Sequence, residues 1–235
     1  MSGAGGASAS AADDTLAGRL AEVAGRITDA AAEAGRGIEE ITTIVVTKFH
    51  PASLVAELAE LGVRDIGENR HQEAQAKAAE LAALDLRWHF IGQLQSKKAR
   101  QVRAYASAIH SVDRPALVDA LRSDEASVDC FVQVNLTDDP GRGGTAPDAL
   151  ESLVERVLET PGLRLRGLMA VAPLDAPARP AFARVRVLSD RVRRLAPDAH
   201  DLSMGMSHDF RDAIMEGATH LRIGTAITGN RPVAG

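Results

Sequence analysis

The chain has 235 residues, of which 32 are acidic and 27 are basic. This slightly acidic balance argues against a nucleic-acid partner or an anionic membrane, and we expect neither. Its single cysteine, Cys130, excludes an internal disulfide, and the sequence has neither an apolar run long enough to cross a bilayer nor a secretory leader, so we expect a cytoplasmic protein.

The predicted elements alternate along the chain between helical and extended segments. Residues 1–13 are rich in Gly, Ala and Ser and predict a flexible N-terminal tail. An Ala-rich amphipathic helix is predicted over 15–34. Eight strand-like segments follow, with helical stretches between them, at 41–48, 64–69, 87–93, 106–113, 129–136, 163–171, 200–206 and 220–227.

This alternation predicts right-handed βαβ units and therefore a parallel sheet. A count of eight strands favours an α/β fold in which residues 14–235 form a single (β/α)8 barrel of the TIM type. Such a barrel has eight outer helices, so the helix at 15–34 is expected to close the ring between the last strand and the first. An open, doubly wound sheet is the alternative.

The first strand, "ITTIVVTK", ends in a lysine, Lys48. Barrels of this type carry their chemistry at the C-terminal ends of the strands, and they bind phosphate in the loops after the last two. Those loops contain "SMGMS" (203–207) and "RIGT" (222–225). A lysine opposite a phosphate cradle is the arrangement for a Schiff base with a phosphorylated aldehyde such as pyridoxal phosphate. The simpler alternative is a lysine that reaches solvent beside glycines that only mark turns.

Six stretches between residues 41 and 231 match the sequence motifs of a known family, in the same order. They are "VVTKFHP", "IGENRHQEAQAK", "WHFIGQLQSKKAR", "IHSVD", "GLMAVAP" and "LSMGMSHDFRDAIMEGATHLRIGTAITGNR". Together they resemble the YggS or PROSC family of pyridoxal phosphate homeostasis proteins. The resemblance implies a single barrel similar to the N-terminal domain of alanine racemase, with pyridoxal 5'-phosphate (PLP) held covalently by the lysine that matches Lys48.

The resemblance also implies roles for other residues of the site. Arg222 would face the pyridine nitrogen, and Asn69 would line the ring. The phosphate would be held by Ser203, Ser207, Gly224 and Thr225, and Met204 completes the implied cofactor-binding set. Three positions depart from the common pattern of the family without touching Lys48 or the phosphate loops, so we expect any effect at the rim of the pocket; they are Lys97, Arg142 and Thr228.

We expect a coenzyme carrier rather than an enzyme. A racemase needs two opposed bases, and related barrels that racemise take a tyrosine from a second domain. The only tyrosine here, Tyr105, ends a helical stretch, and no residues remain for another domain. An arginine at the pyridine nitrogen, as the resemblance implies, would disfavour the protonated ring that makes a strong electron sink.

The implied role is therefore PLP homeostasis by a monomer, with PLP-dependent apoenzymes as candidate recipients. The alternative is a small lysine-dependent enzyme, either a weak fold-type III amino-acid racemase or a Schiff-base aldolase that acts on a sugar phosphate. Bound colour separates the two PLP hypotheses from the aldolase, which would be colourless as purified.

Three other patterns have simple interpretations. The seven histidines lack metal-binding spacing, and we predict no metal site. His110 follows an apolar run and predicts a hydrogen-bonded structural residue, whereas three histidines are expected near the barrel mouth, namely His50, His89 and His208. Glu73 and Lys77 are spaced as an ordinary ion pair on a helix. In "RVRVLSDRVRRL" apolar residues recur at helical spacing, so its arginines predict a solvated face rather than a nucleic-acid site.

Overall fold

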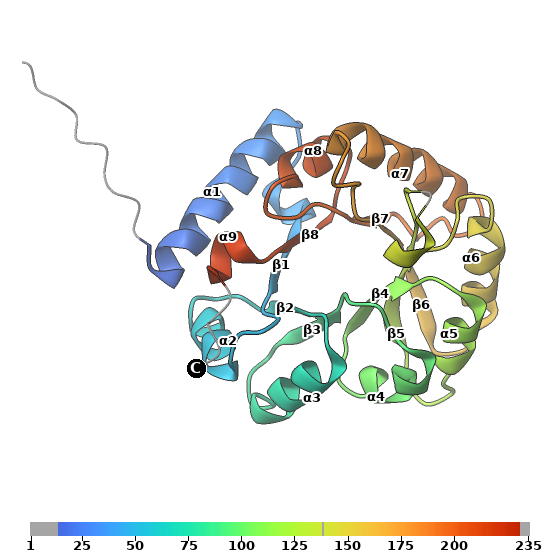
Figure 1. Ribbon diagram of the computed structural model, residues 1–235, viewed down its shortest axis with the longest axis horizontal. Coiled ribbons are helices and arrows are strands. Elements are labelled where there is room, and N and C mark those ends of the chain that lie inside the picture. The colour runs from blue at the N-terminus through green and yellow to red at the C-terminus, as the bar shows by residue number, and fades with distance from the viewer. Residues whose placement is uncertain (1–13, 138, 231–235) are drawn as a thin grey trace, which may run out of the picture.

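The computed structural model describes residues 14–137 and 139–230, so the predicted tail over 1–13 and the last residues of the predicted domain, 231–235, lie outside the described residues. Its strands are β1 (Thr42–Val46), β2 (Asp65–Glu68), β3 (Arg87–Phe90), β4 (Ala108–Val112), β5 (Val128–Gln133), β6 (Leu163–Met169), β7 (Asp201–Ser203) and β8 (His220–Ile223). They pair in parallel in chain order, and β1 also pairs with β8, which closes the sheet into a barrel (Figure 1). The predicted (β/α)8 barrel is confirmed, and the open sheet was wrong.

Helices surround the barrel on all sides (Figure 1). They are α1 (Leu16–Glu33), α2 (Ala52–Glu60), α3 (His71–Glu80), α4 (Ala99–Arg103), α5 (Pro115–Ala120), α6 (Leu150–Glu159), α7 (Ala178–Val192), α8 (Phe210–Met215) and α9 (Thr225–Thr228). Within the described part of the chain, none of these is both long and apolar enough to span a membrane.

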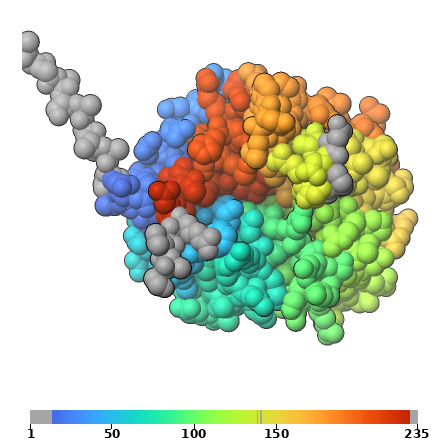
Figure 2. Space-filling model, viewed as in Figure 1, coloured from blue at the N-terminus to red at the C-terminus, as the bar shows by residue number. Residues whose placement is uncertain are grey.

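Helix α1 closes the ring as predicted, because it packs against α8 and α9 from the other end of the chain. The helix begins where the Thr15 side chain accepts a hydrogen bond from the backbone N–H of Gly18, at 3.1 Å. Its buried face includes Val23 and Ile27, four residues apart. Figure 2 shows the resulting surface, in which the blue N-terminal segment lies directly beside the red C-terminal segment.

The last two strands end earlier than the sequence patterns predicted. Strand β8 stops at Ile223 rather than continuing to residue 227, because the chain turns at Gly224 into the short helix α9. Strand β7 stops at Ser203, since Gly205 adopts a φ of 94°, a conformation that favours glycine. Both strands therefore end in tight turns that return the chain toward the barrel mouth.

The protein has two buried layers. The outer layer lies between the sheet and the helices and is apolar, with members such as Val45, Ile109 and Leu221. The inner layer lies within the barrel and contains polar side chains among apolar ones, including the buried His110 and Arg222. Because successive residues of a strand face opposite sides of a sheet, each strand contributes to both layers.

Candidate cofactor site

A cavity of about 270 Å³ opens at the C-terminal ends of the strands. It is lined by Val46, Lys48, Asn69, Ile91, Met169, Val171, Met206, Ser207, His208, Arg222, Gly224 and Thr225. These residues come from or directly follow β1, β2, β3, β6, β7 and β8. The cavity is thus at the barrel mouth, where the fold predicts chemistry, and it combines apolar walls with a few polar groups.

Lys48 stands two residues beyond β1 on a tightly held turn, and its side chain is exposed at the cavity. The N–H of His50 donates to the carbonyl of Thr47 at 3.1 Å. Between them, Phe49 has a φ of 69°, which is a strained conformation for a bulky residue. Among the residues that the structure describes, the Lys48 ammonium has no ion pair or hydrogen-bond partner, so the amine is left available at the mouth.

The strained turn is held from helix α3. The Phe49 N–H donates to the Glu73 carboxylate at 3.1 Å, and the Arg70 guanidinium lies 4.7 Å from the centre of the Phe49 ring. Backbone strain of this kind persists only where the surroundings fix it, and it is concentrated at functional sites. The contacts with Phe49 therefore fix the position of the neighbouring Lys48.

A buried ion pair lies beneath the same turn. Lys77 Nζ donates to Glu68 Oε1 at 2.6 Å and to the carbonyl of Thr47 at 2.9 Å, while Thr47 Oγ1 donates to the same carboxylate at 2.7 Å. The predicted Glu73–Lys77 pair was wrong, because α3 turns Lys77 inward onto β1 and β2, whereas Glu73 binds the Phe49 backbone. Both ends of α3 thus serve to hold the end of β1.

Arg222 is a buried cation without a carboxylate partner in the described structure. Its Nη1 donates to Ser203 Oγ at 2.7 Å and its Nη2 to the carbonyl of Ala170 at 2.9 Å, and both of these acceptors are neutral. Burial lowers the pKa of Arg222 to about 10, which still leaves the guanidinium charged at neutral pH. A buried charge that is not neutralised favours a ligand with an acceptor or a negative charge.

The loops after β7 and β8 meet at the cavity, on the side that lies across the barrel from β3. The Ser207 hydroxyl accepts a hydrogen bond from the N–H of Ala226 at 3.4 Å, which joins the two loops. The N–H of Met206 donates to the Asp209 carboxylate at 2.6 Å and stabilises the turn after Gly205. The hydroxyls of Ser207 and Thr225 therefore border the cavity together, as a phosphate cradle requires.

Asn69 places a polar side chain at the wall of the cavity, between the ends of β2 and β3. Its Oδ1 is buried and has no hydrogen-bond partner. The backbone of Asn69 approaches the next loop so closely that a Cβ on Gly92 would lie 2.2 Å from the Asn69 carbonyl oxygen, which explains the glycine in "HFIGQ". Because an unsatisfied buried polar atom is costly, a ligand that donates a hydrogen bond here would be favoured.

The structure places six of the eight predicted site residues at this cavity; they are Lys48, Asn69, Ser207, Arg222, Gly224 and Thr225. Ser203 and Met204 are instead behind it, since Ser203 Oγ binds Arg222 and Met204 is fully buried in the apolar core. Met206, which the sequence did not single out, lines the cavity after the turn at Gly205.

Sequence patterns also missed the apolar walls of the cavity. The inward-facing residues at the ends of β1, β3 and β6 supply them, and their alternate spacing along each strand could have identified them; they are Val46, Ile91, Met169 and Val171. The three residues that differ from the common pattern of the family do not line the cavity. Lys97 is exposed, Arg142 is half-buried and Thr228 is buried in α9.

The histidines divide between the mouth and the barrel interior. His208 lines the cavity as predicted. His110 is fully buried and hydrogen-bonded on both ring nitrogens, which confirms its structural interpretation. His89 was expected at the mouth but is buried in the interior, where its Nε2 lies 2.9 Å from Asp65 Oδ1. In the described residues, no three His, Cys, Asp or Glu side chains are grouped as a metal site would require.

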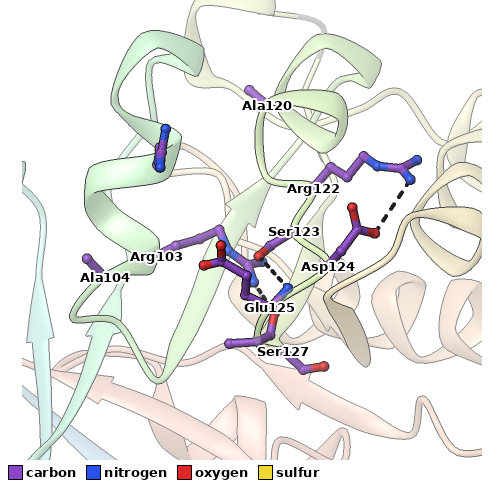
Figure 3. A pocket seen from close by; sticks show the side chains of 10 residues that line it. Arg103, Ala104, Ala120, Arg122, Ser123, Asp124, Glu125 and Ser127 are labelled. Atoms are coloured by element: carbon purple, nitrogen blue, oxygen red, sulfur yellow. Dashed lines mark hydrogen bonds and ion pairs between the residues drawn. The ribbon is translucent and has the colours of Figure 1, made fainter.

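A larger cavity of about 510 Å³ lies at the other end of the barrel, where the chain enters β5 (Figure 3). Its side chains are largely occupied by structural contacts. Arg103 donates to the carbonyls of Leu121 and Gly162, both at 2.8 Å, and Arg122 pairs with Asp124 at 3.5 Å. We therefore assign the functional site to the smaller cavity at the mouth, which contains the unpaired Lys48 amine.

Comparison with known proteins agrees with this architecture. Residues 22–232 match the family model described as the alanine racemase N-terminal domain. A pyridoxal phosphate homeostasis protein of Pseudomonas aeruginosa is 43% identical over 224 residues, which cover 92% of this chain and 96% of that protein. The chain belongs to the pyridoxal phosphate homeostasis protein family. Its Escherichia coli relative of the same name is 38% identical over 226 residues, covering 92% of this chain and 97% of that protein.

Two solved structures have the same barrel fold. PipY of Synechococcus elongatus, solved with PLP bound, is 36% identical with a TM-score of 0.79, and the match covers 92% of this chain and all of that one. Alanine racemase of Corynebacterium glutamicum is 15% identical with a TM-score of 0.70, and the match covers 92% of this chain but 63% of the racemase. The second likeness establishes a shared barrel alone.

Proposed function

We propose that this protein binds PLP as a Schiff base on Lys48 and acts in PLP homeostasis as a carrier rather than as an enzyme. One observation carries the proposal: a single cavity joins the unpaired amine of Lys48, the uncompensated guanidinium of Arg222 and the hydroxyls of two adjoining loops. The PLP-bound PipY structure and the names of the curated relatives support it.

The residues present fit this cofactor. The Lys48 amine would condense with the aldehyde carbon and release water. Ser207 and Thr225 would bind the phosphate, and the apolar walls would hold the ring between them. Arg222, charged at neutral pH, would donate to the ring nitrogen. When bound, PLP supplies an aldehyde that captures amines and, in suitable sites, an electron sink.

Two features favour a carrier over a racemase. A charged Arg222 beside the ring nitrogen opposes protonation of that nitrogen, so the electron sink would be weak. Racemisation also needs a base on each face. Tyr105 does not line the described cavity; it stacks on His71 with ring centres 6.0 Å apart, and burial raises the pKa of its hydroxyl. His208 is the only histidine among the residues that line the described cavity, so the lining does not offer an opposed pair of histidine and tyrosine bases.

The exposed position of Lys48 supports exchange of the coenzyme with recipients. PLP-dependent apoenzymes are the proposed recipients, because PLP leaves Lys48 whenever another amine replaces it. A cytoplasmic monomer belongs to the same proposal, since such apoenzymes are reached by diffusion and the cavity is formed by a single chain.

The visible absorption spectrum tests the binding part of the proposal. Wild type, Lys48→Ala and the matched control Lys97→Ala, whose lysine is exposed and outside the cavity, would each be mixed with PLP and freed of excess. We expect a stable visible chromophore in the wild type and in Lys97→Ala, and none in Lys48→Ala. A colourless wild type would contradict the proposal and favour the aldolase alternative.

An amino-acid racemisation assay on the same samples tests the carrier part. We expect no interconversion of alanine enantiomers above that of free PLP at the same concentration. Turnover that disappears in Lys48→Ala but persists in Lys97→Ala would show an enzyme and overturn the non-catalytic role.

A further inference from the structure

A continuous series of buried hydrogen bonds runs through the barrel interior. We call it the interior polar chain, and its members are Asp65, His89, His110, Ser203 and Arg222. The successive distances are 2.9 Å from Asp65 Oδ1 to His89 Nε2, 2.9 Å from His89 Nδ1 to His110 Nε2, 2.8 Å from His110 Nδ1 to Ser203 Oγ and 2.7 Å from Ser203 Oγ to Arg222 Nη1. All five residues are buried.

The interior polar chain connects the two ends of the barrel. Asp65 is the first residue of β2, at the end opposite the cavity, where Arg87 Nε and Nη2 donate to its carboxylate at 2.7 and 2.5 Å. Arg222 lines the cavity at the mouth. The ring of His110 stacks on Phe131, with centres 4.3 Å apart, so the middle of the chain is also fixed by packing. Hydrogen bonds thereby link the Asp65–Arg87 ion pair at one end of the barrel to the candidate site at the other end.

The hydrogen bonds have a defined direction. Burial alone would raise the pKa of Asp65, but the hydrogen bonds from Arg87 and His89 lower it, so the carboxylate is an acceptor. His89 therefore donates through Nε2, and its Nδ1 accepts from His110 Nε2–H. His110 Nδ1 then accepts the Ser203 hydroxyl proton, which leaves the Ser203 oxygen free to accept from Arg222.

The reverse direction leaves a donor unsatisfied. If His110 donated through Nδ1, Ser203 Oγ would accept from both His110 and Arg222, and its own buried hydroxyl proton would have no acceptor in the described structure. A buried donor without a partner is costly, whereas the forward direction satisfies every member. Burial, and then the nearby His89, His220 and Arg222, lower the pKa of His110 well below its usual value, in agreement with a neutral ring.

We propose that Asp65, His89 and His110 are positioning residues, which act through Ser203 to fix the Arg222 guanidinium against the ring of the bound cofactor. The inference rests on the proposed function for its ligand. Among the described residues no carboxylate binds Arg222, so the direction of its guanidinium depends on the acceptor oxygen of Ser203 and on the Ala170 carbonyl. Because the Ser203 hydroxyl proton is donated to His110, the serine oxygen can only accept from Arg222, and the ion pair of Asp65 with Arg87 anchors the far end.

The tautomers of the histidines test the direction in the apoprotein. Nitrogen NMR of ¹⁵N-histidine-labelled protein at neutral pH would be assigned with His89→Gln and His110→Gln variants. We expect a proton on Nε2 and none on Nδ1 for both rings. A proton on Nδ1 of His110 would overturn the proposed direction, whether or not the protein binds PLP.

A pair of matched variants at the far end tests the positioning role. Arg87 and Arg164 each pair with an aspartate of the preceding strand, and their side chains are similarly exposed, at 60% and 64%. Only Arg87 reaches the interior polar chain, because the partner of Arg164 is Asp129. Arg87→Met should alter the absorption maximum of bound PLP and raise its dissociation rate about tenfold, roughly the loss of one charge-assisted hydrogen bond. Arg164→Met should leave both unchanged.

The outcomes separate the two proposals. Variants that both behave like the wild type, or that both lose PLP alike, would overturn the positioning role while the proposed function stands. A wild type that binds no PLP would overturn the proposed function itself. Thermal unfolding of each apoprotein accompanies the kinetics, and a dissociation rate that follows stability in both variants would mean a structural role alone.

Discussion

Replacing Lys77 by methionine tests how the end of β1 is held. The Lys77 and Glu68 side chains are only 8% and 2% exposed, and the ammonium serves both Glu68 and the carbonyl before Lys48. Methionine keeps much of the side-chain volume but leaves the Glu68 carboxylate buried, with the Thr47 hydroxyl as its one remaining partner among the described residues. Removing one member of a buried pair costs about 3–5 kcal/mol of unfolding free energy.

For a protein of this length, each kcal/mol lowers the midpoint of thermal unfolding by roughly 2–4 °C, so Lys77→Met should unfold roughly 6–20 °C earlier. Urea titration of the apoprotein would measure the free energy directly. The double variant Glu68→Gln, Lys77→Met removes the stranded charge and should recover much of the loss. A surface control, Arg211→Met, breaks an exposed pair with Glu33 and should cost less than about 1 kcal/mol.

A loss below about 1 kcal/mol in Lys77→Met, or a double variant no more stable than the single one, would refute this role of Lys77. The rate of PLP release gives a second test. In Lys77→Met the carbonyl of Thr47, the residue before Lys48, loses its hydrogen bond from Lys77. Lys77→Met should therefore release PLP faster than the wild type does, at temperatures where both are folded.

Two further predictions follow from buried titratable groups. Burial lowers the pKa of His220 to about 4, so the unfolded chain, with a histidine pKa near 6.5, binds more protons between these values. The free energy of unfolding should therefore fall as pH decreases from about 6.5 to 4, and equal urea midpoints at pH 7 and pH 5 would contradict this. The Asp65 carboxylate, whose pKa is lowered in the folded protein, also stabilises the fold. That stabilisation is lost only as the pH falls below 3.8, the pKa of an unperturbed aspartate. Burial raises the pKa of the Cys130 thiol to about 12, so iodoacetamide should label it slowly in the native protein and rapidly in urea; equal rates would refute this.

Sequence patterns were enough to predict the barrel, the lysine and the two loops at its mouth, whereas the individual roles of Asn69, Ser207 and Arg222 came from the family resemblance. Strand and helix alternation set the fold, and the rule that chemistry lies at C-terminal strand ends placed Lys48, Arg222 and Thr225 together. Met204 was misplaced relative to Met206 because Gly205 reverses the chain, so the period-two pattern of the strand does not continue into the loop.

The polar contacts could not be predicted, because they depend on which faces the tertiary structure brings together. The spacing of Glu73 and Lys77 suits a surface pair, but α3 packs with Lys77 toward Glu68, and spacing carries no such information. The sequence holds only a weak sign of the interior polar chain, since His89 and His110 each interrupt a run of apolar strand residues. Without the barrel closure, nothing in the sequence indicates that these two rings meet.

Peptide mapping after borohydride reduction identifies the lysine that binds the coenzyme. The sequence has four lysines, namely Lys48, Lys77, Lys97 and Lys98. Reduction of the PLP-loaded protein fixes the pyridoxyl group on its lysine and blocks tryptic cleavage there. We predict modification only within an uncleaved peptide spanning 37–64, which contains Lys48. A pyridoxyl group found on another lysine, or none in a loaded sample, would contradict it.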